Sequence, residues 1–350
     1  MSPPLAAGIV ARRTLLTLLI SAAGGALAML LHLPAPWLMG GAVAVASAAL
    51  AGVKVMLPNW LRDITFVMTG LSMGASVARD SLTLMVQWPV TLAALVLELI
   101  LIITLTGAFL RRVFKLDAGT AYLSSFPGHL SFVMAMAAAG VGDPRQIVII
   151  QVIRLLMLTV FVPIGALFLP LGPYVAAAGA PEIPVPWIAG VAVACGITGL
   201  VFARLRMPAA FALGAMATSI SFKLLGWFDG VMPPWLLTGV FIFVGALIGS
   251  RFAGITAIEF RQAVAGGLAG TMVTVGIVTA VALAVTPLVD MPFGQIWLGL
   301  SPGAIEGMGS LGIALGFDVA FIAAHHVGRL LLLTFAIPLV ASLVRSRDGA

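Results

Sequence analysis

The sequence predicts an all-α integral membrane protein, a helical bundle, and three observations support this class. First, 61% of the 350 residues are hydrophobic and 9% are charged, whereas soluble domains carry roughly 25% charged residues. Second, apolar stretches of about 20 residues, enough to cross the hydrocarbon core, follow one another along the chain. Third, Pro-Gly pairs interrupt two of these stretches. With a mean hydropathy of +1.18, the chain is expected to use lipid as its solvent.

The charged residues argue against a nucleic-acid partner. The excess of six positive charges comes in short clusters at the ends of apolar stretches, at Arg12 and Arg13 and at residues 111–115 and 345–347. Such clusters are typical of the positive-inside rule, whereas nucleic-acid binding needs a basic face. We therefore expect the lipid bilayer as a partner and no nucleic acid. Cys195 is the lone cysteine, so no disulfide framework is available.

Six apolar segments are predicted before residue 170. The first follows two arginines, as a signal peptide does, but its apolar run of about 18 residues is long for a signal peptide and further spans follow at once. We expect it to be retained as a helix. The fifth segment contains the first Pro-Gly pair, and the sixth carries Arg154. The six segments are 14–32, 36–56, 63–79, 87–110, 117–142 and 146–169.

Six more segments follow a stretch rich in proline and glycine, which is typical of a linker. They bring the expected total to about twelve, and the eleventh contains the second Pro-Gly pair. We divide the chain into a first membrane repeat (1–169), a linker (170–186) and a second membrane repeat (187–345). The later segments are 186–203, 207–225, 234–250, 262–288, 292–317 and 319–343.

The two halves are predicted to be copies of one unit. A shift of 175 residues superimposes the Pro-Gly pairs and places Arg154 on Arg329, within a stretch of seven identities in twelve residues. Polar and Gly/Pro landmarks that keep one offset indicate duplication. Six crossings in each unit would make the repeats parallel and five would invert one of them; we favour six. The aligned stretches are 33–42 with 207–216, 127–128 with 302–303, and 152–163 with 327–338.

This duplicated unit resembles the AbrB family of bacterial integral membrane proteins. The resemblance rests on the PG-x14-D pattern, which ends at Asp143 and again at Asp318, on the following helix with a central arginine, and on LPAPWLMGG at 33–41. It covers essentially the whole chain in two copies. It implies a multi-pass protein of the bacterial inner (plasma) membrane. The family carries two labels, regulator of gene expression and ammonia monooxygenase, and supplies no catalytic residues to carry over.

Each Pro-Gly pair is expected to divide a membrane helix into two half-helices. Proline removes a backbone donor and glycine lowers helix stability, and lipid cannot satisfy the backbone groups that are released. Duplicated transporters place substrates at such breaks, whereas a kink repaired by neighbouring helices is the structural alternative. The break residues that we predict to bind substrate are Pro127, Gly128, His129, Ser131, Pro302, Gly303 and Glu306.

Arg154 and Arg329 are predicted to face protein or a water-filled cavity. Each lies about ten residues into its helix, roughly 15 Å deep, where snorkelling to the surface is difficult. Two guanidinium groups near two half-helix N-termini would suit a carboxylate or another anion. The alternative is that each arginine ties its helix to carbonyls of the broken backbone or neutralises a carboxylate. Gln151 and His326 occupy equivalent positions one turn earlier, and His325 lies beside His326.

Two carboxylates break the symmetry of the halves. Glu98 lies in the middle of an apolar segment and aligns with Val273, while Glu306 follows the second break and aligns with Ser131. A buried carboxylate is protonated or pairs with a cation. We expect either an ion pair, for Glu306 with Arg329 as a candidate partner, or reversible protonation that couples transport to a proton gradient. Gln151, His325 and His326 are further candidates for coupling or pairing.

Two other patterns are interpreted as structural. Asp143 and Asp318 precede the helices that follow the breaks, so we expect them to cap those N-termini. Glycines four residues apart, Gly70 with Gly74 and Gly245 with Gly249, let helices approach closely. We therefore expect packing contacts, and no site, at the glycines.

The function that these features favour is an ion-gradient-coupled secondary transporter or exporter of a small solute, for which an anion is one candidate class. No G-x4-GK[ST] nucleotide loop occurs in the sequence; H+ or Na+ are candidate coupling ions. We expect no catalytic residues, no metal and no cofactor, and leave a homo-oligomer open. The first alternative is a membrane-embedded regulator or sensor that affects gene expression without transport. The second is a monooxygenase-type enzyme, which would need convergent His, Cys and carboxylate ligands.

Overall fold

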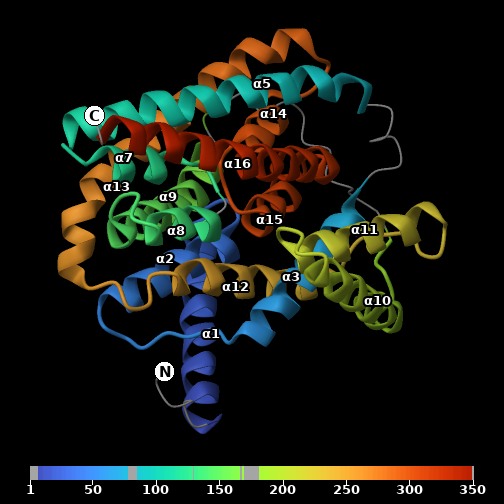
Figure 1. The fold of residues 1–350 in the computed structure, drawn as a ribbon. Helices are drawn as coiled ribbons and strands as arrows, with labels where there is room; N and C mark the ends of the chain where they lie inside the picture. Colours follow the sequence, from blue (N-terminus) through green and yellow to red (C-terminus); the bar gives the residue numbers. More distant parts are fainter. Residues whose placement is uncertain (1–6, 78–84, 129, 166–167, 169–180, 349–350) are drawn as a thin grey trace.

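A computed structural model describes residues 7–77, 85–128, 130–165, 168 and 181–348, and its regular elements are helices (Figure 1). The predicted all-α fold is confirmed. Short helical turns occur at η1 (Met85–Gln87), η2 (Ile102–Thr106) and η3 (Thr286–Leu288). The helices are α1 (Ala7–Leu30), α2 (Pro36–Leu50), α3 (Asn59–Ser76), α5 (Trp88–Leu101), α6 (Gly107–Val113), α7 (Ala118–Ser125), α8 (Leu130–Ala138), α9 (Pro144–Gly165), α10 (Val185–Arg204), α11 (Ala210–Leu224), α12 (Pro234–Ser250), α13 (Ala257–Val285), α14 (Phe293–Leu300), α15 (Ile305–Leu315) and α16 (Val319–Asp348).

Helices occupy all twelve predicted segments, but they differ in length. In the described part of the chain, six helical stretches are long and apolar enough to cross a membrane. Helices α2 and α11 have 15 residues each, about 22 Å at 1.5 Å per residue, which is shorter than a hydrocarbon core of about 30 Å. The six long stretches are Ala7–Leu30, Trp88–Val113, Pro144–Gly165, Val185–Arg204, Ala257–Leu288 and Val319–Leu343.

The same order of helices occurs on both sides of the chain centre. In each half a long helix is followed by two shorter ones, a long helix, a broken pair and a final long helix. An unusual backbone conformation recurs as well. Ala35 and Ala209, which directly precede α2 and α11, have left-handed φ angles of 46° and 47°. Because few non-glycine residues adopt this conformation, its recurrence is what a duplicated unit would produce. The domain division itself stays a prediction.

Two boundaries differ from the expected ones. Helix α1 begins at Ala7, seven residues before the predicted start at 14, because its first turns are apolar apart from Arg12 and Arg13. Helix α10 begins at Val185, within the predicted linker, because Pro184 and Pro186 favour a helix N-terminus. The part of the linker at 170–180 lies outside the described residues.

The halves interlock through small residues. Helix α3 of the first half packs on α11 of the second, and α12 of the second packs on α2 of the first. A Cβ atom added to Gly249 would lie 2.6 Å from Cβ of Val45 and 2.7 Å from the carbonyl oxygen of Ala42. Gly74 lies equally close to α11, at 2.8 Å from the carbonyl oxygen of Met216. The expected packing role of these glycines is confirmed.

Both Pro-Gly pairs interrupt their helices. The first break separates α7 from α8 and the second separates α14 from α15, so the predicted division into half-helices is confirmed. Phe126 and Ser301 end the first halves with nearly equal backbone angles, φ −61° and ψ 123° against φ −57° and ψ 130°. Gly128 has a φ of 118°, a conformation that favours glycine.

The long helices that follow the broken pairs, α9 and α16, begin at aspartate caps. Asp143 accepts hydrogen bonds from the backbone N–H groups of Arg145 and Gln146 at 2.8 and 3.3 Å, and Asp318 accepts one from Ala320 at 2.9 Å. The expected capping role of both aspartates is confirmed.

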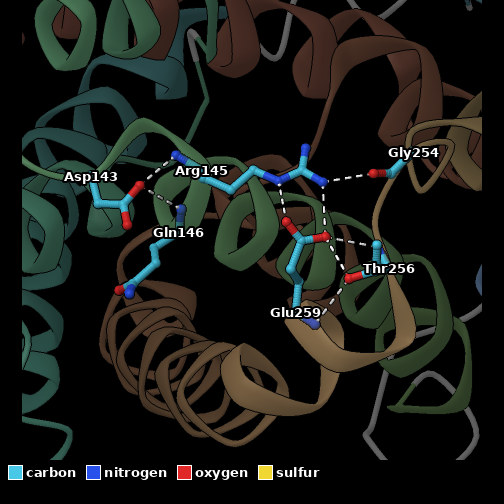
Figure 2. A network of polar contacts seen from close by, with 6 residues as sticks. All are labelled: Asp143, Arg145, Gln146, Gly254, Thr256 and Glu259. Carbon is cyan, nitrogen blue, oxygen red and sulfur yellow. Dashed lines mark hydrogen bonds and ion pairs between the residues drawn. The ribbon is translucent and has the colours of Figure 1, made fainter.

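A polar clamp joins α9 of the first half to α13 of the second (Figure 2). The guanidinium of Arg145 binds both oxygens of Glu259, at 2.7 and 2.9 Å, and the carbonyl oxygen of Gly254 at 2.6 Å. Glu259 in turn forms a capping box with Thr256 at the start of α13. Since Arg145 is 48% exposed, this bidentate pair lies at the rim of the bundle and fixes the N-terminal end of α9.

Candidate functional site

Arg154 binds the end of the first half-helix. It lies in the middle of the 22-residue α9 and is 7% exposed. Its guanidinium donates to the carbonyl oxygens of Ser124, Ser125 and Phe126, at 3.1, 3.4 and 2.7 Å. The break therefore leaves carbonyl groups of α7 that a buried arginine satisfies, as lipid could not.

Arg329 repeats this arrangement at the second break. From α16 it donates to the carbonyl oxygens of Ser301 at 2.8 Å and Gly303 at 2.6 Å. The structural role that the sequence left open for both arginines is thus present in both halves. The Nε atom of Arg329 is buried and has no hydrogen-bond partner among the described residues, so its bonding capacity is not exhausted.

The two breaks meet at one cavity of about 460 Å³, the central cavity. Its volume lies within the usual range for small-molecule sites, roughly 300–1,000 Å³. Side chains from α3, α9, α15 and α16 surround it, together with Arg251, which follows α12, and backbone of both breaks. The residues that the sequence singled out and that line it are Gly128, Gln151, Arg154, Pro302, Gly303, Glu306, His326 and Arg329.

The other predicted site residues lie elsewhere. Pro127 belongs to the first break but does not line the central cavity, and Glu98 and His325 are buried away from it. His129 and the side chain of Ser131 lie outside the described residues. The first break therefore contributes Gly128 to the cavity wall, while the second contributes Pro302 and its neighbours.

Glu306 forms an ion pair with an arginine, but the partner is Arg251 and not Arg329, the candidate that the sequence suggested. A guanidinium nitrogen of Arg251 lies 3.0 Å from a carboxylate oxygen of Glu306, and their side chains are 30% and 6% exposed. The two terminal nitrogens of Arg329 bind carbonyl oxygens of the second break instead. The ion pair therefore joins the end of α12 to the start of α15 across the cavity wall.

Glu98 is fully buried in α5 without a direct ion-pair contact in the described structure. Neither of its oxygens has a hydrogen-bond partner there, yet it lies close enough to Arg329 for the two side chains to interact electrostatically. An ionised carboxylate is costly to bury without partners. Glu98 does not line the central cavity and remains a candidate for reversible protonation.

His325 is occupied by structural contacts. Its Nδ1 lies 2.8 Å from the carbonyl oxygen of Phe321, and its Nε2 lies 2.7 Å from the hydroxyl of Thr91 on α5. The ring also packs against Phe321 and Trp88. His325 therefore ties α16 to α5. Among the described residues, no three His, Cys, Asp or Glu side chains come together as metal ligands.

Gln151 and His326 occupy equivalent positions in the cavity wall but differ in bonding. Gln151 donates its amide to the carbonyl oxygen of Leu123 at 3.1 Å, which adds to the bonds of Arg154 at the first break. His326 has Nδ1 at 2.8 Å from the carbonyl oxygen of Ile322, while its Nε2 is buried without a partner in the described structure. At this position the second half therefore has a ring nitrogen without a hydrogen-bond partner in the described structure, whereas the first half has a side-chain amide that is hydrogen-bonded.

A second, more open recess of about 700 Å³ adjoins the central cavity. Asn59, Arg62 and Asp63 of α3 line this outer recess, and Arg62 and Asp63 bind each other at 2.8 Å. Phe66 and Arg251 line both spaces. The ion pair between Arg251 and Glu306 thus lies where the outer recess meets the central cavity.

Sequence reasoning missed several residues of the cavity wall. Arg251 follows the last residue of α12, and at 55 residues from Glu306 nothing in the local sequence reveals the pairing. Pro208 and Ala209 also line the cavity, and here a signal was present: they align with the LPAP stretch of the first half. Phe66 carries no signal that separates it from other apolar residues of α3.

Comparisons with known proteins point to one family. A family model described as "Transition state regulatory protein AbrB" matches residues 37–345, which include both breaks. The chain is similar to "Putative regulator AbrB" of Escherichia coli (strain K12), with 25% identity over 325 residues that cover 89% of this chain and 91% of that protein. It is also similar to "Uncharacterized protein YhjN" of Bacillus subtilis (strain 168), with 24% identity over 357 residues that cover 91% of this chain and 90% of that protein.

Proposed function

This chain belongs to the AbrB family, and from that premise we propose that it is a secondary transporter or exporter of a small anionic solute. It would work in the bacterial inner membrane, coupled to an ion gradient, with H+ or Na+ as the coupling ion. In this proposal the chain is no enzyme and needs no cofactor or metal. Its partners are the bilayer and the solute, with no nucleic acid, and copies of the chain are free to associate.

One observation carries the proposal: both helix breaks and both buried arginines line one central cavity. Breaks in duplicated membrane bundles are where transporters hold their substrates. The guanidinium groups of Arg154 and Arg329 are fixed by backbone carbonyls, so their positive charge is held in place without a ligand. A fixed cationic wall in a cavity of low polarity favours an anion.

The ion pair of Arg251 and Glu306 supports a coupling step. It lies between the outer recess and the central cavity, so an anion that enters from the recess would meet Arg251 before Arg154 and Arg329. Binding of the anion to Arg251 would release the carboxylate of Glu306, which is then free to take up a proton. Solute entry and protonation would in this way occur together. Glu98 is the second candidate for the proton site.

Uptake by the purified chain in liposomes tests the proposal. With labelled mono- and dicarboxylates as probes, Arg154→Lys and Arg329→Lys should lower uptake. Lysine keeps the charge, but its single nitrogen lacks the planar fork with which a guanidinium binds carbonyls and a carboxylate together. Arg145→Gln is the matched control, since Arg145 is exposed and does not line the central cavity. Unchanged uptake in both lysine variants, with correctly inserted protein, would reject the anion site.

The names of the family and of its Escherichia coli member favour a second candidate, a membrane-embedded regulator that acts on gene expression without transport. The two candidates differ in one measurable respect. In cells that lack the gene, a transporter changes the internal level of its solute before transcription changes. A pure regulator changes transcription while the flux of all tested solutes stays constant. Metabolite levels and transcripts followed together after depletion of the protein separate them.

A further inference from the structure

His326 lines the central cavity and has a buried ring nitrogen without a hydrogen-bond partner among the described residues. The residue is 1% exposed and lines the cavity, and its Nε2 has no hydrogen-bond partner in the described structure. Buried polar atoms are nearly always hydrogen-bonded, because an unmet bond costs free energy. The equivalent Gln151 already donates to Leu123. His326 Nε2 is therefore a place where a ligand atom is expected.

The contact at the other ring nitrogen fixes which kind of atom is expected. Nδ1 of His326 lies 2.8 Å from the carbonyl oxygen of Ile322. A carbonyl oxygen accepts hydrogen bonds and cannot donate them, so Nδ1 must carry the proton. In the neutral imidazole, the majority form of an ordinary histidine at pH 7 and above, Nε2 then has a lone pair and no hydrogen. The cavity wall thus holds an acceptor that needs a donor.

The charges around this acceptor favour one kind of donor group over another. The cavity wall contains three arginines, Arg154, Arg251 and Arg329, against one carboxylate, Glu306. An ammonium group would face like charges there, whereas a hydroxyl group donates without adding charge. The same arginines favour carboxylate oxygens in the rest of the ligand.

We propose that the central cavity selects carboxylates that carry a hydroxyl group, with the arginines binding the carboxylate and Nε2 of His326 accepting the hydroxyl hydrogen. This inference rests on the proposed function and adds a substrate class to it. His326 acts in it as the specificity-determining residue.

Matched pairs of acids that differ by one hydroxyl test the inference. The full chain in lipid nanodiscs is titrated at pH 7.5 with malate against succinate and with lactate against propionate. We expect the hydroxylated acid of a pair to bind about tenfold more tightly, since its hydroxyl satisfies a buried acceptor that the other acid leaves empty. Equal binding within both pairs would overturn the inference while leaving the anion site intact.

The variants separate His326 from its neighbour. His326→Leu should reduce the preference within each pair to about one while binding of succinate persists. His325→Gln is the matched control and should keep the preference, because His325 binds Thr91 and does not line the cavity. If His326→Leu does not fold, the matched acids on the native chain still decide the question.

Two further results have distinct meanings. If no acid of either pair binds, the anion site of the proposed function fails as well. If inorganic phosphate, which also combines an anion with an O–H donor, binds while malate and lactate do not, the carboxylate class is overturned.

Discussion

Replacing Arg251 with glutamine leaves the carboxylate of Glu306 in the cavity wall without its guanidinium partner. The Glu306 side chain is 6% exposed and that of Arg251 is 30% exposed. Breaking a fully buried pair from one side costs about 3–5 kcal/mol, whereas exposed pairs contribute about 0–1 kcal/mol. With one partner buried and the other open to the outer recess, we expect Arg251→Gln to lower the free energy of unfolding by about 2 kcal/mol.

The reverse change should cost less. In Glu306→Gln the unpaired group is Arg251, which can turn toward water in the outer recess, so we expect a loss of about 1 kcal/mol. The double variant removes both charges and leaves two amides, so its stability should lie within about 0.5 kcal/mol of the native chain. A double-mutant cycle of these four proteins isolates the coupling energy of the pair.

Reversible unfolding in mixed detergent and SDS micelles measures these differences, and uptake in liposomes measures their effect on transport. We expect Glu306→Gln to keep exchange of labelled solute across the membrane but to lose acceleration by an inward proton gradient. Additive losses in the cycle would refute the ion pair. Gradient-driven uptake that is unchanged in Glu306→Gln would refute its role in coupling and leave Glu98 as the proton site.

Three further predictions concern packing, the breaks and the clamp. Gly249→Ala should lower the free energy of unfolding by about 1–3 kcal/mol, because the added Cβ atom meets Val45 and Ala42. On the same helix, the Cβ atom added in Gly239→Ala meets nothing within 4 Å, so this control should be neutral or stabilising. Equal effects of the two variants would contradict the close approach of α12 and α2. Arg154→Lys should lose one or more hydrogen bonds to backbone carbonyl oxygens, at about 1–3 kcal/mol each. Hydrogen exchange of the backbone amides in residues 124–128 should then accelerate, and unchanged exchange there would contradict the role of Arg154 at the break. Arg145→Gln should lower the midpoint of thermal unfolding more in low salt than in high salt, because the clamp in Figure 2 is partly exposed and salt screens it. A midpoint equal to that of the native chain at both salt concentrations would show that the clamp does not stabilise the bundle.

Much of the fold could be predicted because a single physical constraint dominates the sequence. Lipid leaves the backbone only helices or closed barrels, and apolar runs of about 20 residues favour helices. The 175-residue offset then relates the broken pair α7–α8 to α14–α15. Proline and glycine mark the breaks because their backbone chemistry acts locally. Helix ends were less predictable. Helix α1 extends through Arg12 and Arg13 into the apolar residues before them, and α10 begins at prolines that hydropathy does not recognise as a helix start.

The site could be predicted residue by residue but not as a set of contacts. Arg154, Arg329, Gln151 and His326 stand out as polar residues in apolar helices, and all four line the central cavity. Which atoms they bind depends on tertiary packing. Arg251 reaches Glu306 only because α12 packs near α15, and no spacing in the chain encodes that approach.

The most direct measurement of the central claim is a density map of the native chain in nanodiscs with saturating malate. The proposed site predicts ligand density in the central cavity between Gly128 and Gly303, with carboxylate oxygens near the arginines and the hydroxyl within hydrogen-bond distance of His326 Nε2. A map in which bound malate lies outside this cavity, or in which helices run unbroken through residues 126–128 and 301–304, would contradict it.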